Sequence, residues 1–129
     1  MSRKFYKIHI ELSDFCALAC SFCTPPKNHR GIMSLELFSR ALKECAAYTD
    51  LIALHLLGDP LTIPNLSDYL DLVWESNLRT EITTSGFYLG NHEQKILRHK
   101  AIKQINISLT SYDSNAKKCD FDTYMKNIF

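Results

Sequence analysis

The sequence lacks long apolar stretches, and neither charge sign dominates it. No run approaches the ~20 apolar residues of a membrane-spanning helix. Glycine and proline are scarce, at four residues each, so no linker or low-complexity tract divides the chain. The net charge of +1 gives no electrostatic indication of a nucleic-acid or membrane surface. With 46% hydrophobic and 22% charged residues, residues 1–129 are predicted to form one globular domain.

A secretory signal is also missing from the amino-terminal residues. Arg3 and Lys4 are followed by Lys7, His9 and Glu11, which interrupt any apolar signal region. Five cysteines in a chain of this kind indicate a reducing compartment. The sequence therefore predicts a cytoplasmic protein.

Three of the five cysteines stand close together, directly after a strand-like opening segment. Cys16, Cys20 and Cys23 have C-x3-C-x2-C spacing, which can place three thiolates around one iron–sulfur cluster. Ordinary cubane clusters take four cysteines. A cluster with only three cysteine ligands keeps one iron open, as a catalytic zinc keeps its fourth position open for substrate. The spacing therefore favours a cluster that binds a second ligand.

Two other interpretations of the cysteines remain open at this stage. Their i, i+4, i+7 spacing would put all three on one buried stripe of a helix. Cys20 and Cys23 alone could form a redox dithiol or half of a zinc site. Zinc would need a second Cys/His pair, and His29 by itself is a poor candidate for one.

Hydrophobic periodicity predicts strands that alternate with helices along the whole chain. Such alternation indicates an α/β fold with right-handed βαβ units and a parallel sheet. The strands are expected at about 6–12, 51–57, 80–84 and 105–109, and the helices at about 34–48, 66–76, 92–99 and from 121 onward.

Polar and glycine-bearing residues follow the expected strands, at the edge where parallel sheets bind ligands. The cysteines follow the first strand, Gly58-Asp59 the second and Ser85-Gly86 the third, and Ser108 closes the fourth. Taken singly, each of these is more often a turn or a hydrogen-bonded hydroxyl than a ligand-binding residue. His55, inside an apolar strand, is interpreted as a hydrogen-bonded core histidine rather than a ligand or base.

With Phe22 between the second and third cysteines, the array reads C-x3-C-x-aromatic-C. In this it resembles the signature of the radical S-adenosylmethionine (radical SAM) family. The resemblance implies a [4Fe–4S] cluster on Cys16, Cys20 and Cys23. It also implies that Phe22 lies against the adenine of S-adenosylmethionine.

The segment from Leu57 to Leu61 is similar to the family's Gly-Gly-Glu-Pro segment, which binds the methionyl amino group. Gly58 would let the backbone approach the cofactor, and Asp59 would offer a carboxylate to the ammonium. The sequence departs from the family where Leu57 replaces the first glycine and where Asp59 is one methylene shorter than glutamate. Ser85 belongs to a Thr-Ser-Gly segment similar to the family's Thr-Asn-Gly, and Ser108 stands where members often present a hydroxyl.

The resemblance implies reductive cleavage of S-adenosylmethionine to a 5′-deoxyadenosyl radical that abstracts hydrogen from a substrate, an oxidoreductase chemistry. A one-electron reductant such as flavodoxin or ferredoxin would be the partner, and the substrate is not indicated. The family core is a partial barrel of six βα units. About four are visible here, so we expect an N-terminal part without strands five and six. The alternatives are a non-catalytic or truncated iron–sulfur fragment and a zinc- or thiol-using α/β domain.

Overall fold

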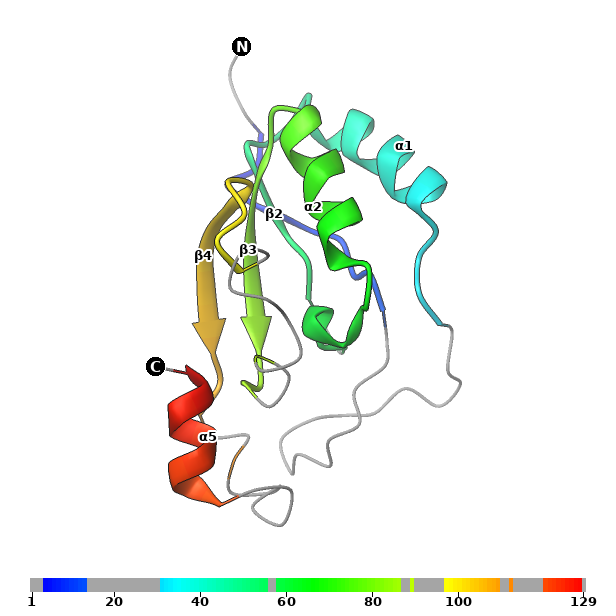
Figure 1. Ribbon diagram of the computed structural model, residues 1–129. Coiled ribbons are helices and arrows are strands. Elements are labelled where there is room, and N and C mark those ends of the chain that lie inside the picture. Colours follow the sequence, from blue (N-terminus) through cyan, green and yellow to red (C-terminus); the bar gives the residue numbers. More distant parts are fainter. Residues whose placement is uncertain are drawn as a thin grey trace.

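The computed structural model describes residues 4–13, 31–55, 58–86, 89, 97–109, 112 and 120–128. Four parallel strands form one sheet in the order β1-β2-β3-β4 (Figure 1). The strands are β1 (Ile8–His9), β2 (Leu51–Ala53), β3 (Arg79–Thr84) and β4 (Ile102–Ile107). Within the described residues, the helices are α1 (Leu35–Cys45), α2 (Leu66–Glu75), α5 (Phe121–Ile128) and a short 3₁₀ helix, η1 (Pro60–Thr62). The predicted parallel α/β fold is confirmed.

Element boundaries differ from the sequence predictions at several places. β1 pairs with β2 at only two positions, although the Ile10 amide still donates to the Ala53 carbonyl at 2.9 Å. β4 begins at Ile102, earlier than the start at 105 that the alternation of apolar residues predicted. The greater part of the helix expected at 92–99 lies outside the described residues.

Helix α1 begins directly after Ser34, which caps its amino end. The Ser34 hydroxyl accepts a hydrogen bond from the Leu37 amide at 3.2 Å, which satisfies one of the free amides of the first turn. The helix ends at Cys45 rather than near Tyr48, because the following residues form a turn. Its side chains Phe38 and Leu42 are fully buried and pack in one core with the apolar residues of α2.

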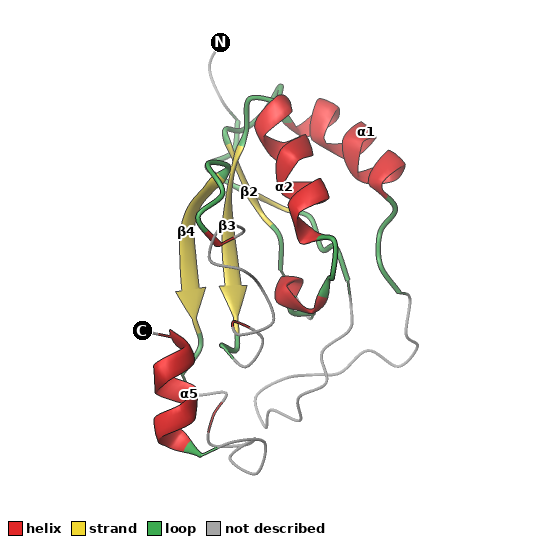
Figure 2. Cartoon of the chain, viewed as in Figure 1, coloured by secondary structure: helices red, strands yellow, loops and turns green. Residues whose placement is uncertain are grey.

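The two faces of the sheet differ in polarity. Figure 2 shows α1 and α2 side by side against the sheet, and the strand residues of the apolar core, such as Ile52 and Ile82, face them. Because side chains alternate along a strand, the residues in between face the other way. On β3 these are Glu81 and Thr83, and on β4 Asn106. We call this second surface the polar face.

Helix α5 has a different place from α1 and α2. It lies at the carboxyl end of the sheet, beyond the arrowheads of β3 and β4 (Figure 1). Its Tyr124 is 1% exposed, whereas Phe121 is exposed, so α5 packs there through the Tyr124 side chain. None of the described helices, α5 included, is long and apolar enough to cross a membrane.

Candidate functional site

The segment that carries the three cysteines leaves and rejoins the described structure at one point, just past β1. Ser13 and Ile32 form an isolated antiparallel bridge, and the Met33 amide donates to the Leu12 carbonyl at 2.7 Å. Cys16, Cys20, Cys23 and Phe22 themselves lie outside the described residues. Both ends of the cysteine segment are therefore fixed at the carboxyl edge of the sheet.

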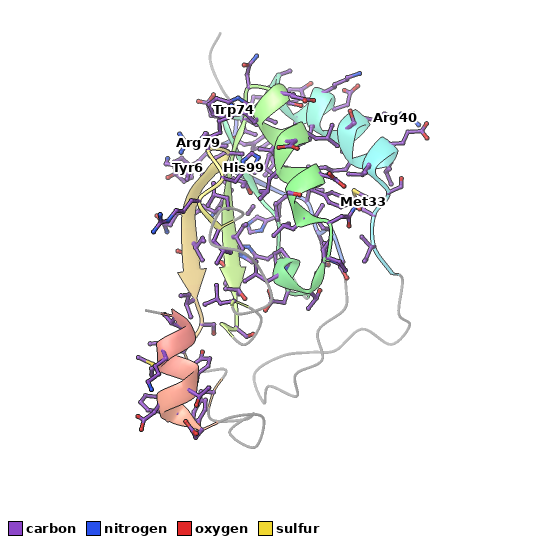
Figure 3. All side chains as sticks on the ribbon, viewed as in Figure 1. Tyr6, Met33, Arg40, Trp74, Arg79 and His99 are labelled. Atoms are coloured by element: carbon purple, nitrogen blue, oxygen red, sulfur yellow. The ribbon has the colours of Figure 1, made fainter. Side chains whose placement is uncertain are left out.

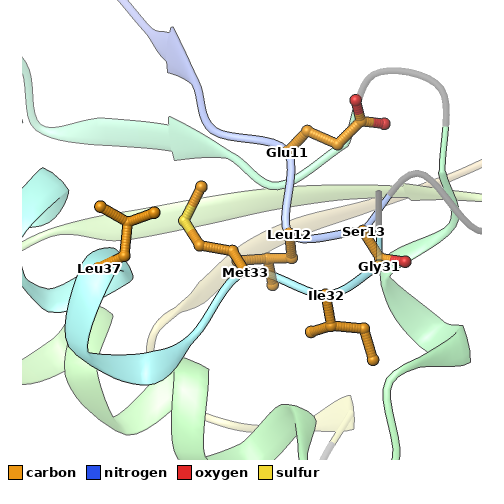
Figure 4. Close-up of a pocket in the computed structure, with 7 residues that line it drawn as sticks. All are labelled: Glu11, Leu12, Ser13, Gly31, Ile32, Met33 and Leu37. Atoms are coloured by element: carbon orange, nitrogen blue, oxygen red, sulfur yellow. The ribbon is translucent and has the colours of Figure 1, made fainter. Parts of the chain in front are cut away.

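A hollow of about 320 Å³ lies beside this bridge. Its walls come from the segment after β1, from the segment leading into α1 and, through Leu37, from the first turn of α1 (Figure 4). The lining residues are Glu11, Leu12, Ser13, Gly31, Ile32, Met33 and Leu37. Apart from the Glu11 carboxylate and the Ser13 hydroxyl, the lining side chains are apolar.

Glu11 links the first strand to the predicted turn after the second strand. Its Oε1 accepts a hydrogen bond from the Gly58 amide at 2.5 Å. Leu57, the residue in place of the family's first glycine, is outside the described residues. Sequence reasoning did not single out Glu11 as a site residue. The available signal was its position as the last polar residue of the alternating segment.

Asp59 is buried, with 4% of its surface exposed, and its carboxylate is tied to the end of β3. Oδ2 accepts hydrogen bonds from the Thr84 hydroxyl at 2.9 Å and from the Ser85 amide and hydroxyl, each at 3.0 Å. Oδ1 accepts from the Leu61 amide at 3.0 Å, which caps η1. The structure thus brings together Asp59 and Ser85, two residues that the sequence predicted separately.

The Ser85–Gly86 turn is held from the other side by α5. The Tyr124 hydroxyl donates to the Ser85 carbonyl at 2.5 Å. Gly86 has φ +91°, and a Cβ on it would lie 3.1 Å from Tyr124 Oη and 3.2 Å from Ile107 Cγ2. Glycine is required here both for the positive φ and for the close approach of α5. Tyr124 was not predicted, because no sequence pattern relates α5 to the third strand.

Ser108 lies next to the same turn. Its amide donates to the Thr84 carbonyl at 2.8 Å, which extends the pairing of β3 and β4 by one residue. The predicted residues Gly58, Asp59, Ser85 and Ser108 therefore all lie at the carboxyl edge of the sheet, as the strand order requires.

The polar face carries ionisable groups in contact with one another. Lys7 Nζ lies 2.9 Å from Glu81 Oε2, and the hydrogen bond from Lys7 lowers the pKa of that carboxyl. His9 Nδ1 donates to the His55 carbonyl at 3.1 Å, and the two rings meet edge to face at 5.4 Å.

His55 departs from the sequence interpretation of a hydrogen-bonded core histidine. Its ring is only half-buried, and its Nδ1 has no hydrogen-bond partner among the described residues. Burial lowers the pKa of His55, with the nearby His9 and Lys7 acting in the same direction, so the ring is neutral at pH 7.

The described residues contain no group of three or more His, Cys, Asp or Glu side chains placed to hold a metal ion. The motif cysteines are not among those residues. Cys45, which is, packs against the core of α1 and α2, and burial raises the pKa of its thiol.

In the described residues, helices α1 and α2 cover one face of a parallel sheet and polar side chains from successive loops lie at its carboxyl edge, the edge at which α/β folds bind their ligands. The family model described as "Radical SAM superfamily" matches residues 10–128, nearly the whole chain. The chain belongs to the radical SAM superfamily.

Its relatives differ in what they act on. The chain is 27% identical over 123 residues to a GTP 3′,8-cyclase of Photorhabdus laumondii subsp. laumondii, covering 87% of this chain and 36% of the cyclase. It is 31% identical over 103 residues to a PqqA peptide cyclase of Ruegeria pomeroyi, covering 77% and 27%. The chain thus spans 36% of the length of the first relative and 27% of the second.

Among solved structures, the chain shares its fold with BtrN in complex with AdoMet and 2-DOIA. The TM-score is 0.66 at 22% identity, over 84% of this chain and 47% of BtrN. At this identity the likeness concerns the fold alone, and it agrees with the parallel four-stranded sheet described above.

Proposed function

We propose that this chain is the cluster- and cofactor-binding part of a radical SAM oxidoreductase. Cys16, Cys20 and Cys23 would bind a [4Fe–4S] cluster, and S-adenosylmethionine would lie against the carboxyl edge of the sheet. The residues proposed to bind the cofactor are Phe22, Gly58, Asp59, Ser85 and Ser108. When bound and reduced, the cluster would supply the electron that cleaves the sulfonium C–S bond and yields a 5′-deoxyadenosyl radical.

One observation carries this proposal. The bridge between Ser13 and Ile32 anchors the cysteine segment at the same edge of the sheet as Gly58, to which Glu11 is hydrogen-bonded. A cluster held by that segment would lie close to the turn that follows β2. The superfamily membership supplies the chemistry, and this anchoring supports its location.

The described side chains at this edge suit a positively charged amino-acid ligand. Glu11 and Asp59 bring two carboxylates, which favour an ammonium or sulfonium group. Oδ1 of Asp59 accepts one described hydrogen bond, whereas Oδ2 accepts three, so Oδ1 keeps a lone pair for an ammonium hydrogen. The part of these residues is to bind and orient the cofactor, and Glu11 and Asp59 also hold the turns in place.

The substrate, the reductant and the cellular location belong to the proposal as well. The curated relatives act on a nucleotide in one case and on a peptide in another, so neither substrate transfers to this chain. A flavodoxin or ferredoxin would supply the electron. The cysteine content favours a cytoplasmic location.

Anaerobic reconstitution with iron and sulfide tests the proposal. We expect about four iron atoms per chain, and an EPR signal of the reduced cluster that changes when S-adenosylmethionine is added. Replacing Cys16, Cys20 and Cys23 by alanine should abolish iron binding. Cys45→Ala is the matched control, since Cys45 is a partly buried cysteine of α1 that packs against the core, and it should retain the iron.

The outcomes separate the competing functions. Iron binding that does not depend on the three motif cysteines would refute the proposal. A cluster that depends on them but does not respond to S-adenosylmethionine would instead indicate a non-catalytic iron–sulfur module. Zinc in place of iron in the purified protein would favour the zinc- or thiol-using α/β domain.

A further inference from the structure

Tyr124 connects α5 to the turn that follows β3, and two independent contacts define this connection. Its hydroxyl donates to the Ser85 carbonyl at 2.5 Å. Its ring lies so close to Gly86 that a Cβ there would be 3.2 Å from Tyr124 Cε2. Both contacts are buried, because Tyr124 is 1% and Ser85 8% exposed.

The Ser85 peptide is consequently held on both sides. Its amide and hydroxyl donate to the Asp59 carboxylate, and its carbonyl accepts from Tyr124. A residue with its amide, hydroxyl and carbonyl all hydrogen-bonded has little freedom to move. A turn fixed in this way can present its outer edge to a ligand without first paying an ordering cost.

The position of α5 fits this role. The other described α-helices, α1 and α2, pack on the face of the sheet, whereas α5 lies beyond the ends of β3 and β4 (Figure 1). The Tyr124 ring is itself supported from outside α5, because the Tyr112 ring stacks on it with the ring centroids 5.1 Å apart. Tyr112 in turn meets Phe121 edge to face at 5.4 Å.

We propose that Tyr124 is a positioning residue of the S-adenosylmethionine site, one that fixes the Ser85–Gly86 turn from α5. This inference rests on the proposed function, because it assumes that Ser85 binds the cofactor. It adds a residue outside the strand-end segments, and it assigns α5 a part in cofactor binding.

The test compares Tyr124→Phe with Thr80→Val in the full chain after reconstitution. The first variant removes only the hydroxyl that reaches Ser85. The second removes a buried hydroxyl that donates to the Ile52 carbonyl at 2.7 Å. Thr80 lies in β3, at the end of the strand opposite to the Ser85–Gly86 turn. We expect both variants to keep their iron. Tyr124→Phe should raise the dissociation constant for S-adenosylmethionine about fivefold or more, and Thr80→Val should leave this constant unchanged.

Amide hydrogen exchange gives a second readout that needs neither cluster nor cofactor. In Tyr124→Phe, exchange at the Ser85 and Gly86 amides should accelerate. The Thr80 amide, which donates to the Ala101 carbonyl at 2.8 Å, should keep its rate.

The outcomes distinguish the two proposals. If the wild type binds iron and cofactor but Tyr124→Phe matches it in affinity and exchange, the positioning role is refuted and the proposed function stands. If both variants lose affinity for S-adenosylmethionine equally, and in proportion to their loss of thermal stability, Tyr124 acts only as a core residue. This result also refutes the positioning role. A wild type that binds no S-adenosylmethionine refutes both proposals.

Discussion

Each end of strand β3 carries a buried threonine, but the two threonine hydroxyls donate to different kinds of acceptor. Thr80 and Thr84 are both buried and lie on the same face of the strand. The Thr80 hydroxyl donates to a backbone carbonyl of the neighbouring strand, at Ile52. The Thr84 hydroxyl donates to a carboxylate, that of Asp59, which comes from the loop after that strand. One end thus reinforces the sheet, and the other holds a loop.

The surroundings of the two ends extend this difference. At the amino end, polar side chains tie neighbouring elements together in pairs. Arg79 reaches the Ile102 carbonyl at 3.4 Å, and His99 Nε2 lies 2.7 Å from Asp71 Oδ1. Arg79 and His99 lie with Tyr6 and Trp74 at this end of the sheet, far from α5 (Figure 3). At the carboxyl end, by contrast, several donors converge on one buried carboxylate. Convergence of this kind is what a preorganised site requires.

Removing the carboxylate should have the largest effect. Asp59→Ala leaves the Thr84 hydroxyl and the Ser85 and Leu61 amides buried without their acceptor. We expect a loss of about 3–5 kcal/mol in the free energy of unfolding, measured by urea titration. Asp68→Ala is the control, because Asp68 is exposed on α2, and it should cost less than about 1 kcal/mol. Similar losses in the two variants would contradict the convergence argument.

Gly86→Ala should come next in size, and the chain provides a close control for it. Gly86 and Gly31 both have φ +91°, but a Cβ on Gly31 would meet no atom of the described residues within 4 Å. Gly31→Ala therefore measures the cost of the backbone conformation alone, about 1–3 kcal/mol. Gly86→Ala adds the contact with Tyr124 and should cost more. Equal costs in thermal unfolding would show that α5 yields to the added methyl group.

Exchanging Thr80 or Thr84 of β3 for valine tests the comparison directly. Thr84→Val deprives a buried carboxylate of one donor, which should cost about 1.5–3 kcal/mol. Thr80→Val deprives a backbone carbonyl of one donor and should cost about 0.5–1.5 kcal/mol. Only Thr84→Val should also speed exchange at the Ser85 amide. If Thr80→Val proved the more damaging, the two ends would not differ in the way proposed.

Much of this arrangement was predictable because it follows from local pattern and strand order. Alternation and buried runs gave the strands, and the parallel order placed Gly58, Asp59, Ser85 and Ser108 at one edge. Tyr124 was not predictable, since its contact with Ser85 spans 39 residues and depends on where α5 packs. Glu11 was missed for a related reason, because its partner Gly58 lies 47 residues away. The role of the cysteine segment stays a prediction, as Cys16, Cys20 and Cys23 lie outside the described residues.

The polar face offers the smallest effect, a dependence of stability on pH. Burial lowers the pKa of His55 below its ordinary value of 6.5, so the folded protein resists protonating this ring more than the unfolded chain does. The unfolded state therefore binds more protons as the pH falls below about 6.5, and stability declines until the pH passes the folded pKa. The loss should be small, since the ring is only half-buried.

The measurement pairs His55→Gln with an NMR titration of the histidine rings. The wild-type His55 resonance should titrate below 6.5, and the variant should lose the decline of stability between that value and the folded pKa. Lys7 and Glu81, which are paired at 2.9 Å, and the His9 ring, 5.4 Å away, also lie near the ring. An unshifted His55 titration would mean that water or a further part of the protein satisfies Nδ1. In that case the polar face would be as fully hydrogen-bonded as the Asp59 end of the sheet.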